Sequence, residues 1–419
     1  MPEQPAGYRE VFAVREYRHL FTANLLSMIG DQLTAVALSF LVYQRSGSSL
    51  LAALTFAGSY LTWVVGGPLL AVLADRLPRR RVLLGGDLVR AALVLLMLVP
   101  GMPVALLVAI AFVANLCRPP FQSARSSLLP DILHGDRYPV ANGLDNIVAE
   151  VTQVAGFALG GLLVTVGSAQ TVLAVDAATF LLSATLIATG LRRCAAATEV
   201  AAEPSGSWWA ETTAGVRVVF TDRALRSYLL LFWLACLVYG TEGVVAPLAG
   251  EYGGGARVGG LLLAMMPAGV AIGGVLLTRF CPPELRQKLM LPLAVLSCAV
   301  LLPVAAQPPL PVVLVLLFVS GLAGAFSIPL NALFGRAVPA AYRARAFGVA
   351  MSGLCAVQGL SMLGAGAVAE TVRPSLVVGG AALLATLAVL VVLATSAGVF
   401  TPARPAQPVA EPERDPVPA

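Results

Sequence analysis

The sequence predicts an all-α integral membrane protein with twelve transmembrane helices, arranged as two pseudo-symmetric six-helix bundles. Three observations lead to this fold class. Hydrophobic residues make up 58% of the 419 residues and charged residues only 12%, whereas a soluble protein of this length needs far more polar surface. Apolar runs long enough to cross a bilayer follow one another along the chain. Three short patterns of the first half also recur in the second.

The apolar runs are separated by short connections rich in glycine and proline, such as PGMP at 100–103 and AQPPLP at 306–311. We expect helices over residues 18–43, 50–74, 82–99, 104–124, 144–166, 170–190, 226–248, 257–279, 289–306, 311–333, 346–368 and 374–398.

The longest polar interruption follows the sixth span. It contains ATEVAAEPSGS, which is typical of a flexible linker, and WWAETTAGVRVVF, which could form an amphipathic helix at the membrane surface. The last residues are rich in proline and charge, so we expect a disordered tail. The predicted organisation is an N-terminal bundle at 1–191, a cytoplasmic linker at 192–225, a C-terminal bundle at 226–400 and a tail at 401–419.

The basic residues predict the orientation, because lysine and arginine are retained on the cytoplasmic side. Three of them (Arg45, Arg257 and Arg373) fall in outer connections and two (Arg90 and Arg118) within spans, which leaves 22 of the 27 on the side of the termini. Both termini are therefore expected in the cytoplasm. The chain is expected to be a multi-pass protein of the inner (cytoplasmic) membrane. The net charge of +5 follows from this bias and needs no nucleic-acid partner.

Several function classes find no support. The six cysteines show no paired or metal-type spacing, and His19 and His134 are the only histidines, so we expect no disulfide, no metal and no hydrolase triad. No Walker-type Gly-Lys-Ser/Thr sequence is present, so ATP does not drive the protein directly. The N-terminal residues mix acidic and basic side chains and lack a signal-peptide pattern.

The three recurring patterns lie close to half the chain apart. A GG pair at 66–67 precedes RRR at 79–81, as GG at 273–274 precedes RQK at 286–288. FQSARSSLLP follows the fourth span as NALFGRAVP follows the tenth, and GFALGG has a looser counterpart in GLSMLGAG. Duplicated halves are typical of transporters.

At these residues the chain resembles a family. LADRLPRRR is similar to the loop signature of the major facilitator superfamily, which Asp75, Arg76, Arg79 and Arg80 match, whereas alanine and proline replace its two glycines. GFALGG resembles the fifth-helix antiporter signature through Gly156, Gly160 and Gly161, with Phe157 in place of its proline. GDQLTAVALSFLVYQRSGS, RSSLLPDIL, VANGLDNIV and VDAATFLLSA are similar to bacterial siderophore and macrolide exporters.

The resemblance implies alternating access by two rocking halves and a protein that acts as a monomer. It also implies that Asp75 faces the N-terminus of the eleventh helix, where a partial positive charge attracts a carboxylate and holds the cytoplasmic side closed. The alternative is that Asp75 is a loop residue whose charge is solvated. For Arg79, Arg80 and Arg81 we favour the role of cytoplasmic anchors.

Asp31 is the most informative single residue. A carboxylate midway along a membrane helix costs about 2.5–3.5 kcal/mol, so it should face protein or a watery cavity. Asn24, Ser27, Asp31 and Thr34 lie on one stripe of the first helix. Asp31 either takes up a proton or contacts the substrate, or it is a structural hydrogen-bonding group.

Other membrane-embedded charges are weaker candidates. Glu150 shares a face of the fifth helix with Asn146 and Gln153 and could carry a proton or form a gating ion pair. Glu242 on the seventh helix could couple protons or reach the interface. Arg118 could bind an anionic substrate group or neutralise a carboxylate. Gln358 is a further candidate for the cavity wall. Three more charges are expected to be structural: Asp87 and Arg90, which we expect to pair with each other, and Asp176.

The sequence therefore predicts a secondary transporter that exports a small lipophilic compound (a drug, siderophore or natural product) in exchange for protons, with no cofactor besides the proton gradient. The alternatives are an importer or facilitator of the same fold and a non-transporting membrane sensor. A membrane enzyme is less well supported, since no catalytic set is evident.

Overall fold

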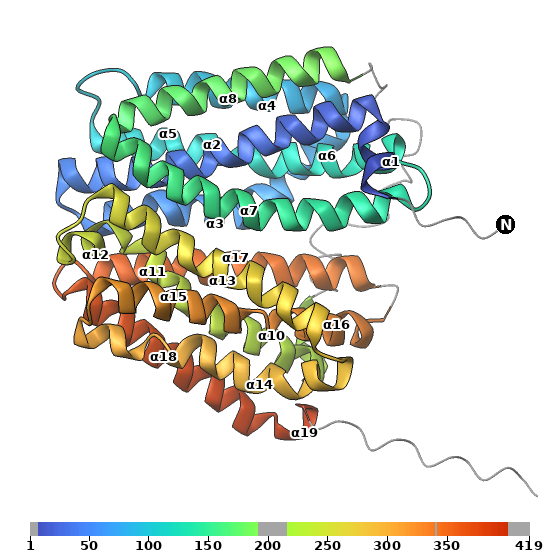
Figure 1. Ribbon diagram of the computed structural model, residues 1–419. Coiled ribbons are helices and arrows are strands. Elements are labelled where there is room, and N and C mark those ends of the chain that lie inside the picture. The colour runs from blue at the N-terminus through green and yellow to red at the C-terminus, as the bar shows by residue number, and fades with distance from the viewer. Residues whose placement is uncertain (1–6, 192–215, 340–341, 401–419) are drawn as a thin grey trace, which may run out of the picture.

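A computed structural model describes residues 7–191, 216–339 and 342–400; the side chains at 65, 67–76, 146, 344 and 397 lie outside that description. Helices from the two parts of the sequence form two bundles that lie side by side, one from α1 to α8 and the other from α10 to α19 (Figure 1). Helices α1 and α19 lie at the same end of the molecule (Figure 1). This is the cytoplasmic end by the distribution of basic residues, and the opposite end is the outer end.

The helices of the N-terminal half are α1 (Tyr8–Ala13), α2 (Arg15–Ser46), α3 (Ser49–Arg76), α4 (Arg79–Leu96), α5 (Val104–Leu116), α6 (Arg118–Ile132), α7 (Arg137–Val166) and α8 (Ala169–Gly190). Those of the C-terminal half are α10 (Arg223–Ala235), η1 (Cys236–Tyr239), α11 (Gly240–Gly243), α12 (Val245–Glu251), α13 (Ala256–Phe280), α14 (Pro283–Ala299), η2 (Leu302–Ala306), α15 (Leu310–Gly324), α16 (Ser327–Ala337), α17 (Arg343–Val368), α18 (Pro374–Thr395) and α19 (Ala397–Phe400).

Helix occupies all twelve predicted ranges. Within the described part of the chain, ten helical segments are long and apolar enough to cross a membrane. The second range is α3, of which Ser49–Val64 forms a shorter apolar helix, and the third is α4, which carries five charged residues. Residues 192–215 of the predicted linker at 192–225, which include most of the expected interfacial helix, fall outside the described residues, as does the tail at 401–419.

Four spans predicted as continuous helices are instead interrupted, and proline explains each break. Proline has no amide hydrogen to donate to the carbonyl four residues earlier. Accordingly, α5 ends at Leu116, four residues before Pro120, and α11 ends at Gly243, four residues before Pro247. The same spacing relates the end of α14 to Pro303 and the break after α15 to Pro329. The fourth span also runs on to Ile132, beyond the predicted limit of 124.

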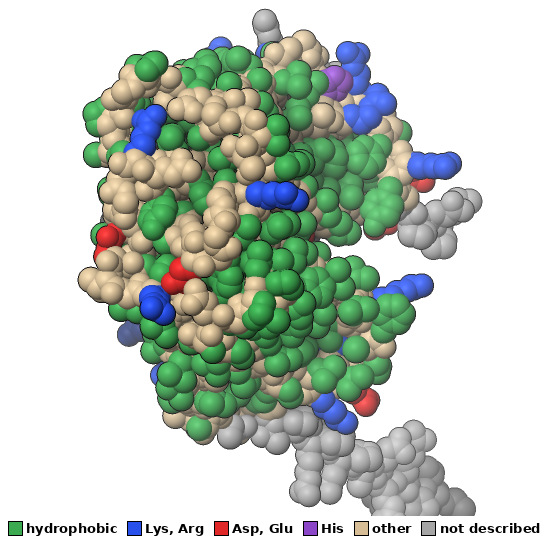
Figure 2. Space-filling model, turned by 60° about the vertical axis from the view of Figure 1, so that its left-hand side comes forward, with side chains coloured by type: hydrophobic (Ala, Val, Ile, Leu, Met, Phe, Trp, Pro, Cys, Tyr) green, Lys and Arg blue, Asp and Glu red, His purple; other side chains and the backbone are tan. Residues whose placement is uncertain are grey.

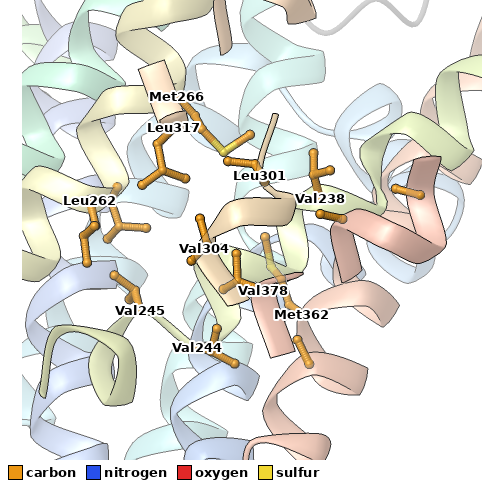
Figure 3. Close-up of a cluster of buried hydrophobic side chains, with 14 of the residues drawn as sticks. Val238, Val244, Val245, Leu262, Met266, Leu301, Val304, Leu317, Met362 and Val378 are labelled. Carbon is orange, nitrogen blue, oxygen red and sulfur yellow. The ribbon is translucent and has the colours of Figure 1, made fainter. Parts of the chain in front are cut away.

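The halves pack together toward the outer end. There α7 packs along α13, and α3 packs along α17. One apolar core crosses the boundary, because Val36, Phe40, Phe56, Ala57 and Phe157 of the N-terminal half are buried among residues of the C-terminal half. Figure 3 shows the C-terminal part of this core, where Val245, Met266, Leu317 and Met362 converge from four helices.

Toward the cytoplasmic end the halves have separate cores. One cluster, built around Tyr17, Phe121 and Leu128, draws only on the N-terminal half, and another, built around Leu229 and Phe334, draws only on the C-terminal half. Figure 2 shows the surface continuing from one half to the other at the outer end and notched between them on the opposite side. The structure is thus closed outside and parted toward the cytoplasm.

Candidate functional site

Asp31 is held between two arginines from two neighbouring helices. Its Oδ1 accepts a hydrogen bond from Arg90 on α4, and its Oδ2 lies 3.3 Å from Nε of Arg118, the first residue of α6. The side chain of Arg90 is only 4% exposed, that of Asp31 10% and that of Arg118 24%. Arg90 also lies over the ring of Phe180, 4.1 Å from its centroid. Two cations surround one carboxylate, so the trio carries a net positive charge.

Asp31, Arg90 and Arg118 line a cavity of about 210 Å³ in the N-terminal half. We call it the Asp31 cavity; its other walls are Asn24, Ser27, Met28, Trp63, Phe121 and Gln122. Arg118 is the most exposed of the three charged side chains, and therefore presents the positive charge to the cavity.

The predicted stripe of α2 divides between two environments. Asn24 and Ser27 line the Asp31 cavity. Thr34 instead donates a hydrogen bond to Oδ2 of Asp176 on α8 at 2.6 Å. The expected pairing of Asp87 with Arg90 is wrong: Arg90 binds Asp31, and Asp87 accepts a hydrogen bond from Ser183 at 2.5 Å. The cause is that α8 packs against α4 and offers Asp87 a hydroxyl, while α2 offers Arg90 a carboxylate.

Glu150 faces a second cavity, of about 200 Å³, which we call the Glu150 cavity. Gln358 of α17 lies in its wall, together with Tyr239, Phe232 and Phe326. Gln153 is half-buried on α7 and does not line this cavity. The side chain of Asn146 lies outside the described part.

Glu242 is buried at the boundary between the halves rather than at the membrane surface. Its side chain is on α11 of the C-terminal half, and its Oε2 accepts a hydrogen bond from the hydroxyl of Tyr60 on α3, at 3.4 Å. Glu242 is 3% exposed, and its Oε1 has no hydrogen-bond partner among the described residues. Of the two alternatives for Glu242, reaching the interface is wrong, because the side chain is buried and bonded to Tyr60, and proton coupling stays a prediction.

The glycine motif of α7 allows close helix packing on two sides. A Cβ atom on Gly156 would meet Gln32 of α2 at 2.5 Å, and one on Gly160 would meet Val36 at 3.2 Å. A Cβ atom on Gly161 would meet the carbonyl oxygen of Ala256 at 2.4 Å and Cα of Gly260 at 2.9 Å. Gly161 therefore brings α7 into backbone contact with α13 across the boundary between the halves.

The basic loop between α3 and α4 is tied to its own half. Arg79 forms an ion pair with Asp131 and donates a hydrogen bond to the carbonyl of Ser127 at 3.0 Å. Arg80 donates to the carbonyl of Ala188 at 2.5 Å. The side chains of Asp75 and Arg76, including the expected latch, lie outside the described part.

Sequence reasoning missed two polar contacts of this kind. Arg125, which is 2% exposed, binds Oδ1 and Oδ2 of Asp145 at 2.7 Å each and links α6 to α7. Glu370, just after α17, accepts hydrogen bonds from α3 at the outer end. Charge alone could have flagged these residues, but their pairing depends on which helices are neighbours.

The described residues contain no group of three or more histidine, cysteine or acidic side chains that could hold a metal ion. What the arrangement offers is two cavities with ionisable groups and aromatic walls. The Asp31 cavity lies within the N-terminal half, and the Glu150 cavity has residues of both halves in its wall. Such an arrangement can bind a small molecule and exchange protons.

Comparisons with known proteins agree with this architecture. Residues 20–306 match the model of the Major Facilitator Superfamily. Among solved structures, the nucleoside transporter NupG superposes with a TM-score of 0.68 at 13% identity over 91% of this chain and 99% of its own. A bacterial homologue of the human lysosomal transporter Spinster, in an inward-facing, unoccupied conformation, gives a TM-score of 0.66 at 15% identity over 94% and 97%. These likenesses confirm the predicted fold class.

Relatives by sequence include two efflux proteins. The multidrug efflux pump Tap of Mycolicibacterium fortuitum is 27% identical over 368 residues, 83% of this chain and 88% of Tap. Macrolide efflux protein A of Streptococcus pyogenes is 21% identical over 62% of this chain, and the MFS-type transporter YkuC of Bacillus subtilis is 25% identical over 58%. The chain spans 65% and 59% of the lengths of these last two proteins. The chain belongs to the Major Facilitator Superfamily, a family of multi-pass membrane proteins.

Proposed function

We propose that the chain is a proton-coupled exporter of a small, largely apolar compound. The observation that carries the proposal is the position of Asp31, in the wall of a cavity and shared by Arg90 and Arg118. A proton on Asp31 would weaken its attraction for Arg118, and loss of that proton would restore it. One titratable group can thus change the charge that the cavity presents to a substrate.

The direction of transport is proposed from the relatives, since Tap and macrolide efflux protein A are efflux proteins. The driving force is sufficient for modest accumulation. One charge crossing 100 mV provides about 2.3 kcal/mol, or roughly a forty-fold concentration ratio.

The test uses everted membrane vesicles with a panel of lipophilic drugs and a pH-sensitive dye. The wild type is expected to move protons when a transported compound is added, and Asp31→Asn to lose this response. Because Asp31→Asn leaves the buried Arg90 without its carboxylate, protein quantity and melting temperature are measured alongside. Arg118→Gln tests the same pair from the side that faces the cavity.

Glu284→Gln, on an exposed position of α14, is the matched control and should behave as wild type. Coupled transport that persists in folded Asp31→Asn would remove Asp31 from the mechanism. Substrate-dependent growth of a transport-deficient host, without conferred resistance, would favour an importer over an exporter.

A further inference from the structure

The Glu150 cavity is built almost entirely by the C-terminal half. Its walls come from α10 and η1, α13, α14, the α15–α16 break and α17, and Glu150 of α7 is the one lining residue from the N-terminal half. Any molecule bound there against Glu150 would touch both halves at once.

Glu150 has no counter-ion within the described part of the chain. No hydrogen bond or ion pair links it to another described residue, and no lysine or arginine lines its cavity. Four other carboxylates in the spans of the N-terminal half have described partners: Asp31 and Asp145 pair with arginines, and Asp87 and Asp176 accept hydrogen bonds from hydroxyl groups. A carboxylate in a partly buried position without a partner is unfavourable, so a positive charge supplied from outside would stabilise it.

The neutral walls of the cavity also favour a cation. Phe232 and Phe326 lie in the wall with ring centroids 6.5 Å apart and planes inclined at 76°, and Tyr239 adds a third ring. Aromatic faces attract ammonium groups that come within about 6 Å of the ring centroid.

Two serine hydroxyls in the wall donate their protons to backbone carbonyls. Ser297 donates its proton to the carbonyl of Ala294 at 2.8 Å, and Ser320 donates to the carbonyl of Ser297 at 2.6 Å. Their donors are occupied, so what remains available is oxygen lone pairs. A cation can use these, whereas an anion cannot.

We propose that the Glu150 cavity binds the ammonium group of an organic cation, with the carboxylate of Glu150 as counter-ion and the rings of Phe232, Phe326 and Tyr239 around its apolar body. The inference rests on the proposed function and names the substrate class: a lipophilic amine or quaternary ammonium compound. Because the counter-ion and the aromatic walls belong to different halves, the bound cation joins the halves at the cavity.

The test measures binding to the full-length protein purified in detergent, by isothermal titration calorimetry at pH 7. The probes are (4-hydroxyphenyl)trimethylammonium and 4-tert-butylphenol, which have nearly the same shape and differ in charge. A quaternary ammonium group does not titrate, so its binding reports on the cation site and not on proton carriage by Glu150.

The wild type is expected to bind the cation at least ten-fold more tightly than the neutral probe. Glu150→Gln should abolish this preference, Glu150→Asp should keep part of it, and Glu284→Gln should keep all of it. Phe326→Leu should weaken cation binding several-fold and leave the neutral probe almost unchanged.

A wild type that does not prefer the cation, or a folded Glu150→Gln that still does, would overturn the inference. Because this experiment measures binding alone, its failure leaves the vesicle test of proton-coupled export unaffected. If the vesicle test fails while cation binding is intact, the proposal of proton-coupled export is rejected and the proposal of a cation site in the Glu150 cavity stands.

Discussion

The carboxylate of Glu370 accepts a hydrogen bond from the hydroxyl of Ser48 at 2.7 Å, across the boundary between the two halves. The same Oε1 accepts the backbone amide of Leu50 at 2.8 Å. Ser48 caps the N-terminus of α3, and Glu370 follows the C-terminal end of α17. A residue of the C-terminal half thus satisfies the exposed amide end of a helix in the N-terminal half, where a negative charge is favoured. The contact helps to close the outer end.

We predict that Glu370→Gln loosens the outer end. The hydrogen bond from Leu50, followed by that from Ser48, holds the pKa of Glu370 below its usual value of 4.5. The stabilisation is therefore complete above the usual pKa and is lost as pH falls through the lowered one. Hydrogen exchange at the start of α3 should become several-fold faster in Glu370→Gln at pH 7.

Glu251→Gln is the matched control for Glu370→Gln. Glu251 accepts the backbone amide of Ser375 at 3.0 Å, a similar contact at the start of α18 that stays within one half. Loss of this contact in Glu251→Gln should speed hydrogen exchange at the start of α18 and leave hydrogen exchange at α3 unchanged. If hydrogen exchange at α3 is unchanged in Glu370→Gln, the contacts of Glu370 with Ser48 and Leu50 add nothing to the closure of the outer end.

Gly161→Ala should weaken the contact between α7 and α13. Alanine normally stabilises a helix by about 1 kcal/mol relative to glycine, but here its Cβ would meet the carbonyl of Ala256 at 2.4 Å. We expect a lower melting temperature and slower transport. Gly143→Ala on the same helix, where a Cβ meets nothing within 4 Å, should be neutral or stabilising. Equal effects of the two substitutions would argue against the close contact.

Replacing Arg90 and replacing Arg118, the two partners of Asp31, should lower the free energy of unfolding by different amounts. Arg90 is almost fully buried and donates a hydrogen bond to Asp31, so Arg90→Gln removes a buried hydrogen bond between charged groups and should lower the free energy of unfolding by about 2–3 kcal/mol. Arg118 is more exposed, and Arg118→Gln should cost about 1 kcal/mol. Unfolding in detergent checks the order, and an equal loss in both variants would contradict it.

Glu242→Gln should leave stability unchanged or raise it. Glu242 is buried without a cationic partner in the described part, and glutamine can still accept the hydrogen bond from Tyr60 without needing a counter-charge. Tyr60→Phe in the wild-type background should lower stability by about 1 kcal/mol, because it leaves Glu242 without that donor. A clear loss of stability in Glu242→Gln would indicate an ionic role that the described contacts do not contain.

Much of the fold could be predicted from the sequence, because the bilayer imposes one length and one polarity on every span. The interruptions of the spans were harder to predict. Proline follows each of them by a few residues, but Pro130, Pro267 and Pro292 lie inside helices that continue past them. Apolar composition concealed them, since hydropathy does not register a missing amide hydrogen. The extension of the fourth span to Ile132 was missed because Arg125 looked like a loop residue, whereas Asp145 neutralises it inside the bundle.

The members of the candidate site were easier to predict than their partners. A charge within a membrane span is costly, so Asp31, Arg118, Glu150 and Glu242 could be identified by position alone. Their partners depend on the packing of distant helices. Arg90 lies three residues from Asp87, yet it donates to Asp31 of α2, because α8 packs against both α2 and α4. No spacing within one helix contains that information.

The apolar core shared by the two halves should make the equilibrium between closed and open forms of the outer end depend on temperature. Phe56 and Phe157 meet edge to face, 6.3 Å apart, in a core completed by the C-terminal half. Opening the outer end would wet these rings, as partial unfolding does, while every helix stays intact. Exposure of apolar surface to water raises the heat capacity. The free-energy difference between the inward- and outward-facing forms should therefore be a curved function of temperature. At one temperature the closed outer end should be most stable.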